Sequence, residues 1–147
     1  MKGQKMIEFT RQRFARRFAI LNVFVLFAIA VMWREGLVWP LFRDDSSHLS
    51  VVIVAWTFWG LTVVWRGEWA RVEEFMDDVV SLGLLGTVIG FAEALVRITP
   101  EAVSTGATAE MVGAFVQGAR TALYTTIVGS CGNWWMRANV VMLRGFK

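Results

Sequence analysis

Four long apolar segments dominate the chain and limit what it can fold into. They run over residues 18–33, 49–65, 79–96 and 111–136. A helix that crosses the hydrocarbon core of a bilayer uses roughly 20 residues, so each segment is long enough, or nearly so, to span a membrane. The sequence therefore predicts an all-α integral membrane protein, with four transmembrane helices in a single domain over residues 18–143.

The composition agrees with a membrane protein and excludes several other classes. Of the 147 residues 56% are hydrophobic and 18% are charged, whereas soluble domains carry about 25% charged residues. A single Cys and a single His exclude an intramolecular disulfide and a four-ligand zinc site. The sequence has neither a Ser/His/Asp set nor a phosphate-binding loop with its lysine. We predict no enzymatic activity, no cofactor and no nucleic-acid partner.

The distribution of basic residues predicts the orientation in the membrane. Four crossings place the N-terminal tail, the loop after the second segment and the C-terminal tail on one side. These parts hold Lys2, Lys5, Arg11, Arg13, Arg16, Arg17, Arg66, Arg71, Arg137, Arg144 and Lys147, against Arg34, Arg43 and Arg97 on the other side. Because cytoplasmic loops carry an excess of Lys and Arg, both termini are predicted to be cytoplasmic.

Three stretches lie outside the apolar segments, and each has an expected role. Residues 1–17 are either an amphipathic helix on the inner membrane surface or only a positive topology signal. Residues 66–78 are expected to extend the third transmembrane helix into solvent. Residues 97–110 form an outer connector, in which Pro100 suits the start of a short helix.

Glycines and threonines recur at helical spacing in the last two segments. Gly83, Gly86 and Gly90 fall on one helical face, with Thr87 beside them. Such a face lets another backbone approach closely, which is typical of helix packing in membranes. The fourth segment has a matching stripe of small residues: Gly118, Ala122, Thr125 and Gly129.

These two motifs resemble those of the MotA/TolQ/ExbB proton-channel family. The resemblance rests on Leu-Gly-Leu-Leu-Gly-Thr-Val-Ile-Gly at 82–90 and Ala-Leu-Tyr-Thr-Thr-Ile-Val-Gly at 122–129, and it covers about residues 79–140. It implies a pentameric ring in the bacterial inner membrane, around two copies of a MotB/TolR/ExbD-like single-span partner. The partner supplies the aspartate that takes up and releases protons, and sodium in place of protons stays open as the translocated ion. The resemblance also implies that Thr87 and Thr126, with Thr125 as neighbour, lie on the ion pathway.

The chain departs from the family pattern in two ways. Some members carry a glutamate where this chain has Thr121, next to the unusual membrane charge of Arg120, and the membrane acid here is Glu93. If Thr87 and Thr126 share one depth, Glu93 and Arg120 each lie six residues, or about 9 Å, from these threonines toward the outer side of the membrane. We predict that they pair, with Arg97 as an alternative partner of Glu93. The second departure is the inner loop, which lacks the large cytoplasmic domain of the family.

Three functions remain open from the sequence. The first is the ring subunit of a proton-driven stator, in which the hydroxyls of Thr87 and Thr126 orient a proton. The second is a small four-helix proton-coupled exporter that uses Glu93 as its titrating group. The third is a structural membrane scaffold, in which the threonine hydroxyls have no role.

Overall fold

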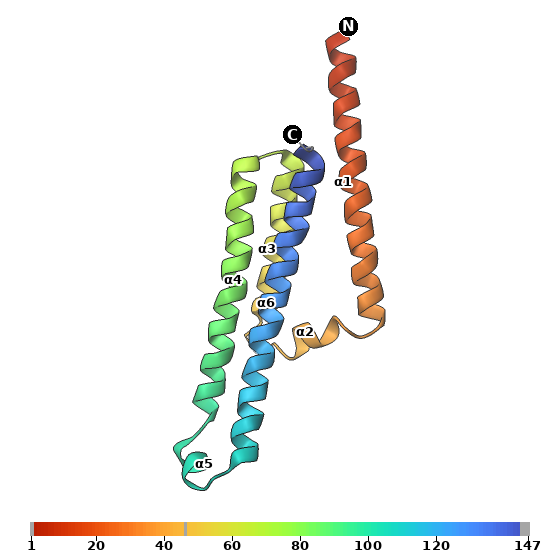
Figure 1. Cartoon of the computed structure of the whole chain (residues 1–147). Coiled ribbons are helices and arrows are strands. Elements are labelled where there is room, and N and C mark those ends of the chain that lie inside the picture. Colours follow the sequence, from red (N-terminus) through yellow and green to blue (C-terminus); the bar gives the residue numbers. More distant parts are fainter. Residues whose placement is uncertain (1, 46, 145–147) are drawn as a thin grey trace.

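The structure of this chain is a computed structural model that describes the backbone of residues 2–45 and 47–144. Side chains are described for residues 15–45, 47–100 and 103–143. Every regular element in this part of the chain is a helix, which confirms the predicted all-α class (Figure 1). The helices are α1 Lys2–Arg34, α2 Trp39–Arg43, α3 Leu49–Arg66, α4 Trp69–Arg97, α5 Pro100–Ser104 and α6 Thr108–Arg144.

Three of these helices are long and apolar enough to cross a membrane. The candidate spans are Ala15–Arg34 in α1, Leu49–Arg66 in α3 and Trp69–Arg97 in α4. They indicate a membrane protein and contain the first three predicted segments. α6 is longer than any of them, but residues such as Gln117 and Arg120 make it less apolar than α3. The fourth crossing therefore stays a prediction.

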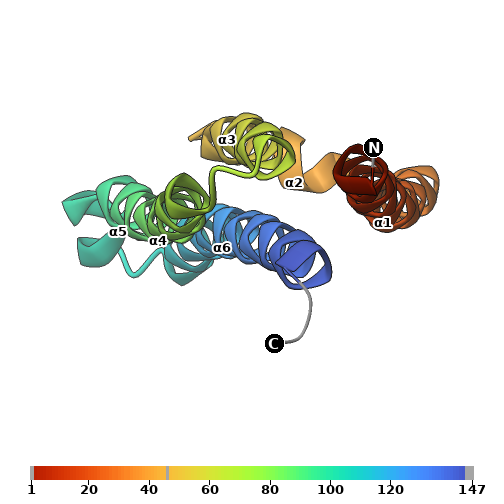
Figure 2. The same cartoon turned by 90° about the horizontal axis from the view of Figure 1, so that it is seen from above.

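α3, α4 and α6 pack along one another, and α1 lies to one side of them. Figure 2 shows the three packed helices, with α2 leading from them to α1. The most extensive contact is between α4 and α6. Ile53, Val79 and Met136 are fully buried where α3, α4 and α6 meet, and Val64 and Val72 form a second core near the α3–α4 turn.

Short connections set the ends of α3. Gly67 ends it with φ of +74°, and its N–H donates to the carbonyls of Val63 and Val64, as is usual for a helix C-terminus. At the other end, the buried Asp45 carboxylate accepts hydrogen bonds from the Ser47 N–H at 3.1 Å and the Ser50 N–H at 2.8 Å. Burial raises the pKa of Asp45, but these hydrogen bonds and that from the Ser47 hydroxyl outweigh burial and lower the pKa below its ordinary value.

The helices extend further than the predicted segments. α1 begins at Lys2, so the N-terminal tail and the first span form one continuous helix. The side chains that would make the tail amphipathic fall among residues 1–14, outside the described side chains. Residues 69–78 belong to the same helix as 79–96, which confirms the helical part of the predicted extension, whereas Gly67 and Glu68 form the turn before it. The solvent exposure predicted for this extension in the membrane stays a prediction. The outer connector contains α5, which begins at Pro100 as predicted, whereas α2 was not predicted.

Candidate functional site: the α4–α6 contact

The glycine face of α4 lies directly against the small-residue stripe of α6. Gly83, Gly86, Gly90 and Ala94 of α4 are buried. So are Gly118, Ala122, Thr125 and Gly129 of α6. Because these residues recur every three or four positions, the two helices stay in contact over about three turns. The structure thus brings together the two motifs that the sequence analysis singled out.

The two backbones approach so closely that larger side chains have no room. A Cβ atom added to Gly90 would lie 2.6 Å from both the Ala122 nitrogen and the Gly118 carbonyl oxygen. One added to Gly129 would lie 2.9 Å from the Val79 carbonyl oxygen. Since these neighbours are backbone atoms, they cannot move aside without separating the helices. Glycine is required here by the close approach of the helices.

Thr87 of α4 and Thr126 of α6 meet across this contact. Their hydroxyl oxygens lie 2.5 Å apart, and either one can be the donor. Thr126 also hydrogen bonds the Ala122 carbonyl at 2.8 Å, and Thr87 hydrogen bonds the Gly83 carbonyl at 3.2 Å. Both threonines are half-buried, so part of each residue is exposed at the surface of the chain. A partner that covers this surface would therefore meet two adjacent threonines whose hydroxyls are already paired with each other.

Thr125 lies differently from its neighbour. It is fully buried, and its hydroxyl donates within α6 to the carbonyl of Thr121 at 3.0 Å or of Ala122 at 3.1 Å. Its side chain fills the space that a Cβ of Gly86 would occupy. Thr125 thus packs the helix contact, while Thr87 and Thr126 form the accessible polar pair.

The hydroxyl pair can bind or orient a proton carrier but cannot titrate. A threonine hydroxyl donates one hydrogen bond and accepts two, so the pair can contact a carboxylic acid, a carboxylate or water. Among the described residues, no group of three or more His, Cys, Asp or Glu side chains could hold a metal ion. A titrating group for this site would have to approach from another chain.

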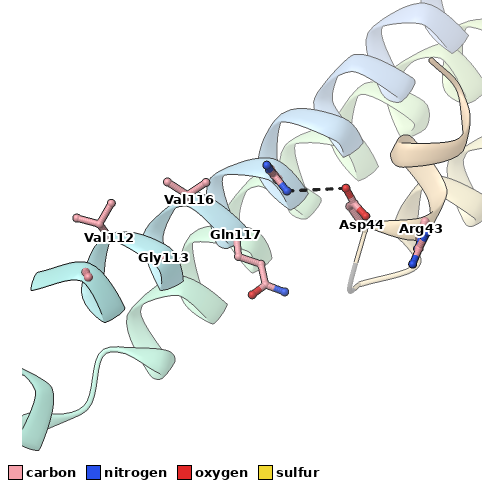
Figure 3. A pocket seen from close by; sticks show the side chains of 8 residues that line it. Arg43, Asp44, Val112, Gly113, Val116 and Gln117 are labelled. Carbon is pink, nitrogen blue, oxygen red and sulfur yellow. Dashed lines mark ion pairs between the residues drawn. The ribbon is translucent and has the colours of Figure 1, made fainter. Parts of the chain in front are cut away.

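Glu93 and Arg120 lie at similar depth, as expected from their positions. Ala94, next to Glu93, packs on Gly118, which is two residues from Arg120. The ion pair that the structure gives Arg120 joins its Nη1 to Asp44 Oδ2 at 4.0 Å (Figure 3). Arg97 donates to Gln117 Oε1 at 2.7 Å. The pairing of Glu93 with Arg120 or with Arg97 stays a prediction.

The Arg120–Asp44 pair lies in an open groove between the α2–α3 connection and the N-terminal part of α6. The groove has a volume of about 680 Å³. Figure 3 shows the lining side chains, with the ion pair at one end and the apolar part of α6 at the other. The lining residues are Arg43, Asp44, Ala109, Val112, Gly113, Val116, Gln117 and Arg120. Sequence reasoning missed Asp44, because nothing local to it indicates a partner 76 positions away.

A second polar contact was also missed, and it joins α1 to α6. Asn22 donates to Asn139 Oδ1 at 2.8 Å, and Trp135 Nε1 donates to Asn22 Oδ1 at 2.8 Å. Asn139 is fully buried and donates to the Trp135 carbonyl at 3.0 Å. The available signal was an asparagine inside each of two apolar helices, since such residues often hydrogen bond across helices.

Comparisons with protein-family models, with curated proteins and with solved structures give no match. The function is therefore argued from the site and from the resemblance of its motifs.

Proposed function

We propose that this chain is the ring subunit of a stator driven by the proton-motive force. In this proposal all four long helices cross the bacterial inner membrane, and both termini are cytoplasmic. Five copies surround two copies of a MotB/TolR/ExbD-like single-span protein, whose aspartate takes up and releases protons. The three apolar helices support a membrane location. The ring, the partner and the ion come from the resemblance of the two motifs.

The observation that carries the proposal is the contact between the Thr87 and Thr126 hydroxyls, 2.5 Å apart on closely packed helices. The closely packed glycine backbone fixes the two helices, so the hydroxyls are held in place before any partner arrives. A small preorganised polar site in an environment with little water distinguishes a charged carboxylate from a neutral one. That difference is what a protonation-driven step of the partner helix needs.

The size of the chain makes the proposed motor small. Only the turn at Gly67 separates α3 from α4, and residues 69–78 continue into the span. The chain therefore has no inner-loop domain through which force could pass. The driven process would receive force on the outer side, through the partner.

The proposal is tested by removing each hydroxyl while keeping its shape. Thr87→Val and Thr126→Val are expected to leave the mass of the solubilised complex unchanged. Losing a hydrogen bond to a charged group costs about 1.5–3 kcal/mol, so proton flux into vesicles that hold the chain and its partner should fall roughly tenfold or more. Thr62→Val is the matched control, because Thr62 is exposed on α3 and its hydroxyl donates to the Trp59 carbonyl of its own helix.

Two other outcomes would replace the proposal. If both valine variants keep full flux, the hydroxyls have no role, and the chain acts as a scaffold. If the native complex is a dimer without a partner, and flux depends on Glu93, the chain is a small proton-coupled exporter. The native mass of the complex, purified with neighbouring membrane proteins untagged, separates these outcomes first.

A further inference from the structure

α1 has an exposed stripe on the face opposite its contact with α6. Asn22 points toward α6, whereas Ile20, Val23, Phe24 and Phe27 are 61%, 66%, 70% and 67% exposed. Arg16 and Arg17 are exposed at the inner end of the same face. At 100° per residue, Arg16, Ile20, Val23 and Phe27 lie within one narrow arc. The stripe is basic at its inner end and apolar further out.

α4 has an exposed stripe with the opposite charge. Glu74 and Asp77 are exposed at its inner end. Leu84 and Val88 follow on the same arc and are 58% and 65% exposed. Arg71, one turn before Glu74 on the same helix, forms its ion pair with Glu68 at 2.9 Å and interacts more weakly with Glu74, so it offsets the charge of the stripe only in part. Both helices run from the inner to the outer side, so the two stripes have the same order of charged and apolar residues.

The acidic end of the α4 stripe lies beside an apolar span. Asp78 accepts a hydrogen bond from Trp56 Nε1 at 3.3 Å. Trp56 lies ten residues, or about 15 Å, from the end of α3 at Arg66. The exposed carboxylates of α4 therefore lie at depths where α3 faces hydrocarbon, and carboxylates at such depths face protein or water, not lipid.

The basic end of the α1 stripe lies at nearly the same depth. Phe18 contacts Trp65, with ring centroids 5.0 Å apart, and it packs on the cluster that contains Val72. Arg16 is therefore about one helical turn further inward than Glu74, a distance that an arginine side chain can span. The α1 stripe lies opposite Asn22, which faces α6, and the α4 stripe lies opposite the glycines that face α6. Figure 2 shows α1 and α4 themselves on different sides of the molecule.

We propose that α1 of one copy docks on the exposed α4 stripe of the next copy. Arg16 and Arg17 then meet Glu74 and Asp77, and the aromatic part of α1 covers Leu84 and Val88. The two stripes differ and lie on opposite sides of the chain, so the contact is head-to-tail and generates a ring when the rotation closes. This inference rests on the proposed function for the existence of the ring, and it names the surfaces that build it.

Cross-linking between copies tests the inference in the membrane. In a Cys131→Ala background, one tagged copy carries Phe27→Cys and a second, differently tagged copy carries Leu84→Cys. Oxidation should link the two tags at least five times more than a control pair of Val25→Cys with Leu84→Cys, since Val25 packs toward the core. Arg16→Glu with Arg17→Glu should lower the linked product at least fivefold. Adding Glu74→Arg and Asp77→Arg should restore it.

Native mass separates failure of the inference from failure of the proposed function. Five subunits with the cross-link support both. Five subunits without a cross-link above control overturn the inference and leave the stator proposal intact. A monomer without a cross-link overturns both. If Leu84→Cys links instead to a single-span protein, or if the charge swap fails to rescue, α1 does not cover the α4 stripe.

Discussion

The α4–α6 contact and the α1–α6 contact join helices of similar length by opposite means. α4 and α6 meet backbone to backbone through glycines, and the contact runs along both helices. α1 meets α6 through one group of hydrogen-bonded side chains around Asn22 and leaves most of its surface exposed. The glycine contact thus fixes how far apart α4 and α6 lie. The contact around Asn22 fixes only the position of α1 along α6 and the face of α1 that is turned toward α6.

The largest loss of stability is expected where a substitution adds an atom that clashes with the backbone of the neighbouring helix. Gly90→Ala places a Cβ 2.6 Å from the Ala122 nitrogen and should lower the free energy of unfolding by about 1–3 kcal/mol, because the helices must separate. The measurement is unfolding in mixed detergent, followed by tryptophan fluorescence. Gly113→Ala is the control on α6, where no atom lies within 4 Å of the added Cβ. Its stability should be unchanged or slightly higher, and equal losses for the two variants would contradict the role of close approach.

A smaller effect is expected at the α1–α6 contact. Asn22→Leu removes the partner of Asn139 and of Trp135 Nε1 and should cost about 1 kcal/mol, within the range for interhelical hydrogen bonds in membranes. The same unfolding measurement applies, with Asn133→Leu as the control on α6 outside this group. If Asn22→Leu lowered the free energy of unfolding as much as Gly90→Ala, the α1–α6 contact would contribute as much stability as the α4–α6 contact, against this prediction.

Asp45, in the connection from α2 to α3, should stabilise the fold to an extent that depends on pH. The pKa of Asp45 is lowered in the folded chain, so its carboxylate stabilises the fold above the unfolded pKa of about 3.9, and this contribution is lost as pH falls through the folded value. Asp45→Asn should therefore lower the free energy of unfolding by about 1 kcal/mol at pH 7, because both carboxylate oxygens accept hydrogen bonds and an amide has only one acceptor oxygen. The difference should vanish once the carboxyl is protonated. Unfolding at a series of pH values checks this, with Asp44→Asn as the neighbouring control.

The smallest change in the free energy of unfolding is expected for the ion pair in the groove beside α6. Arg120 and Asp44 are 4.0 Å apart and their side chains are 59% and 37% exposed, so their coupling should stay below about 0.5 kcal/mol. A double-mutant cycle with Arg120→Gln and Asp44→Asn measures it. A parallel cycle with Glu93→Gln measures the predicted Glu93–Arg120 pairing. A coupling above 1 kcal/mol with Glu93 alone would assign Arg120 to Glu93 in the assembled protein.

The helix contacts differ in how much of them could be predicted from the sequence. The glycine faces of α4 and α6 were predictable because periodicity alone places Gly83, Gly86 and Gly90 on one side of a helix. A common depth for Thr87 and Thr126 was expected from the resemblance, since periodicity does not align two helices, but their direct hydrogen bond was not predicted. The contact between Asp44 and Arg120 was not predictable, because neither residue carries a local signal of a partner 76 positions away. Asn22 and Asn139 carried the weaker signal of an asparagine inside an apolar helix, which indicates a hydrogen bond across helices but not its partner. α2 was missed because five residues are too short for a periodic pattern.

The position of α6 after α1, α3 and α4 in the sequence determines the order in which these contacts can form. α1, α3 and α4 leave the ribosome before α6, yet the faces of α4 that carry Gly83 and Gly90 are covered only by α6. During synthesis these faces stay without their partner until residues 118–129 have been made. Asn22 of α1 stays without its partner until Asn139 has been made. A nascent chain halted before Gly118 therefore lacks the contact between α4 and α6, and synthesis of residues 118–139 is what supplies both this contact and the partner of Asn22.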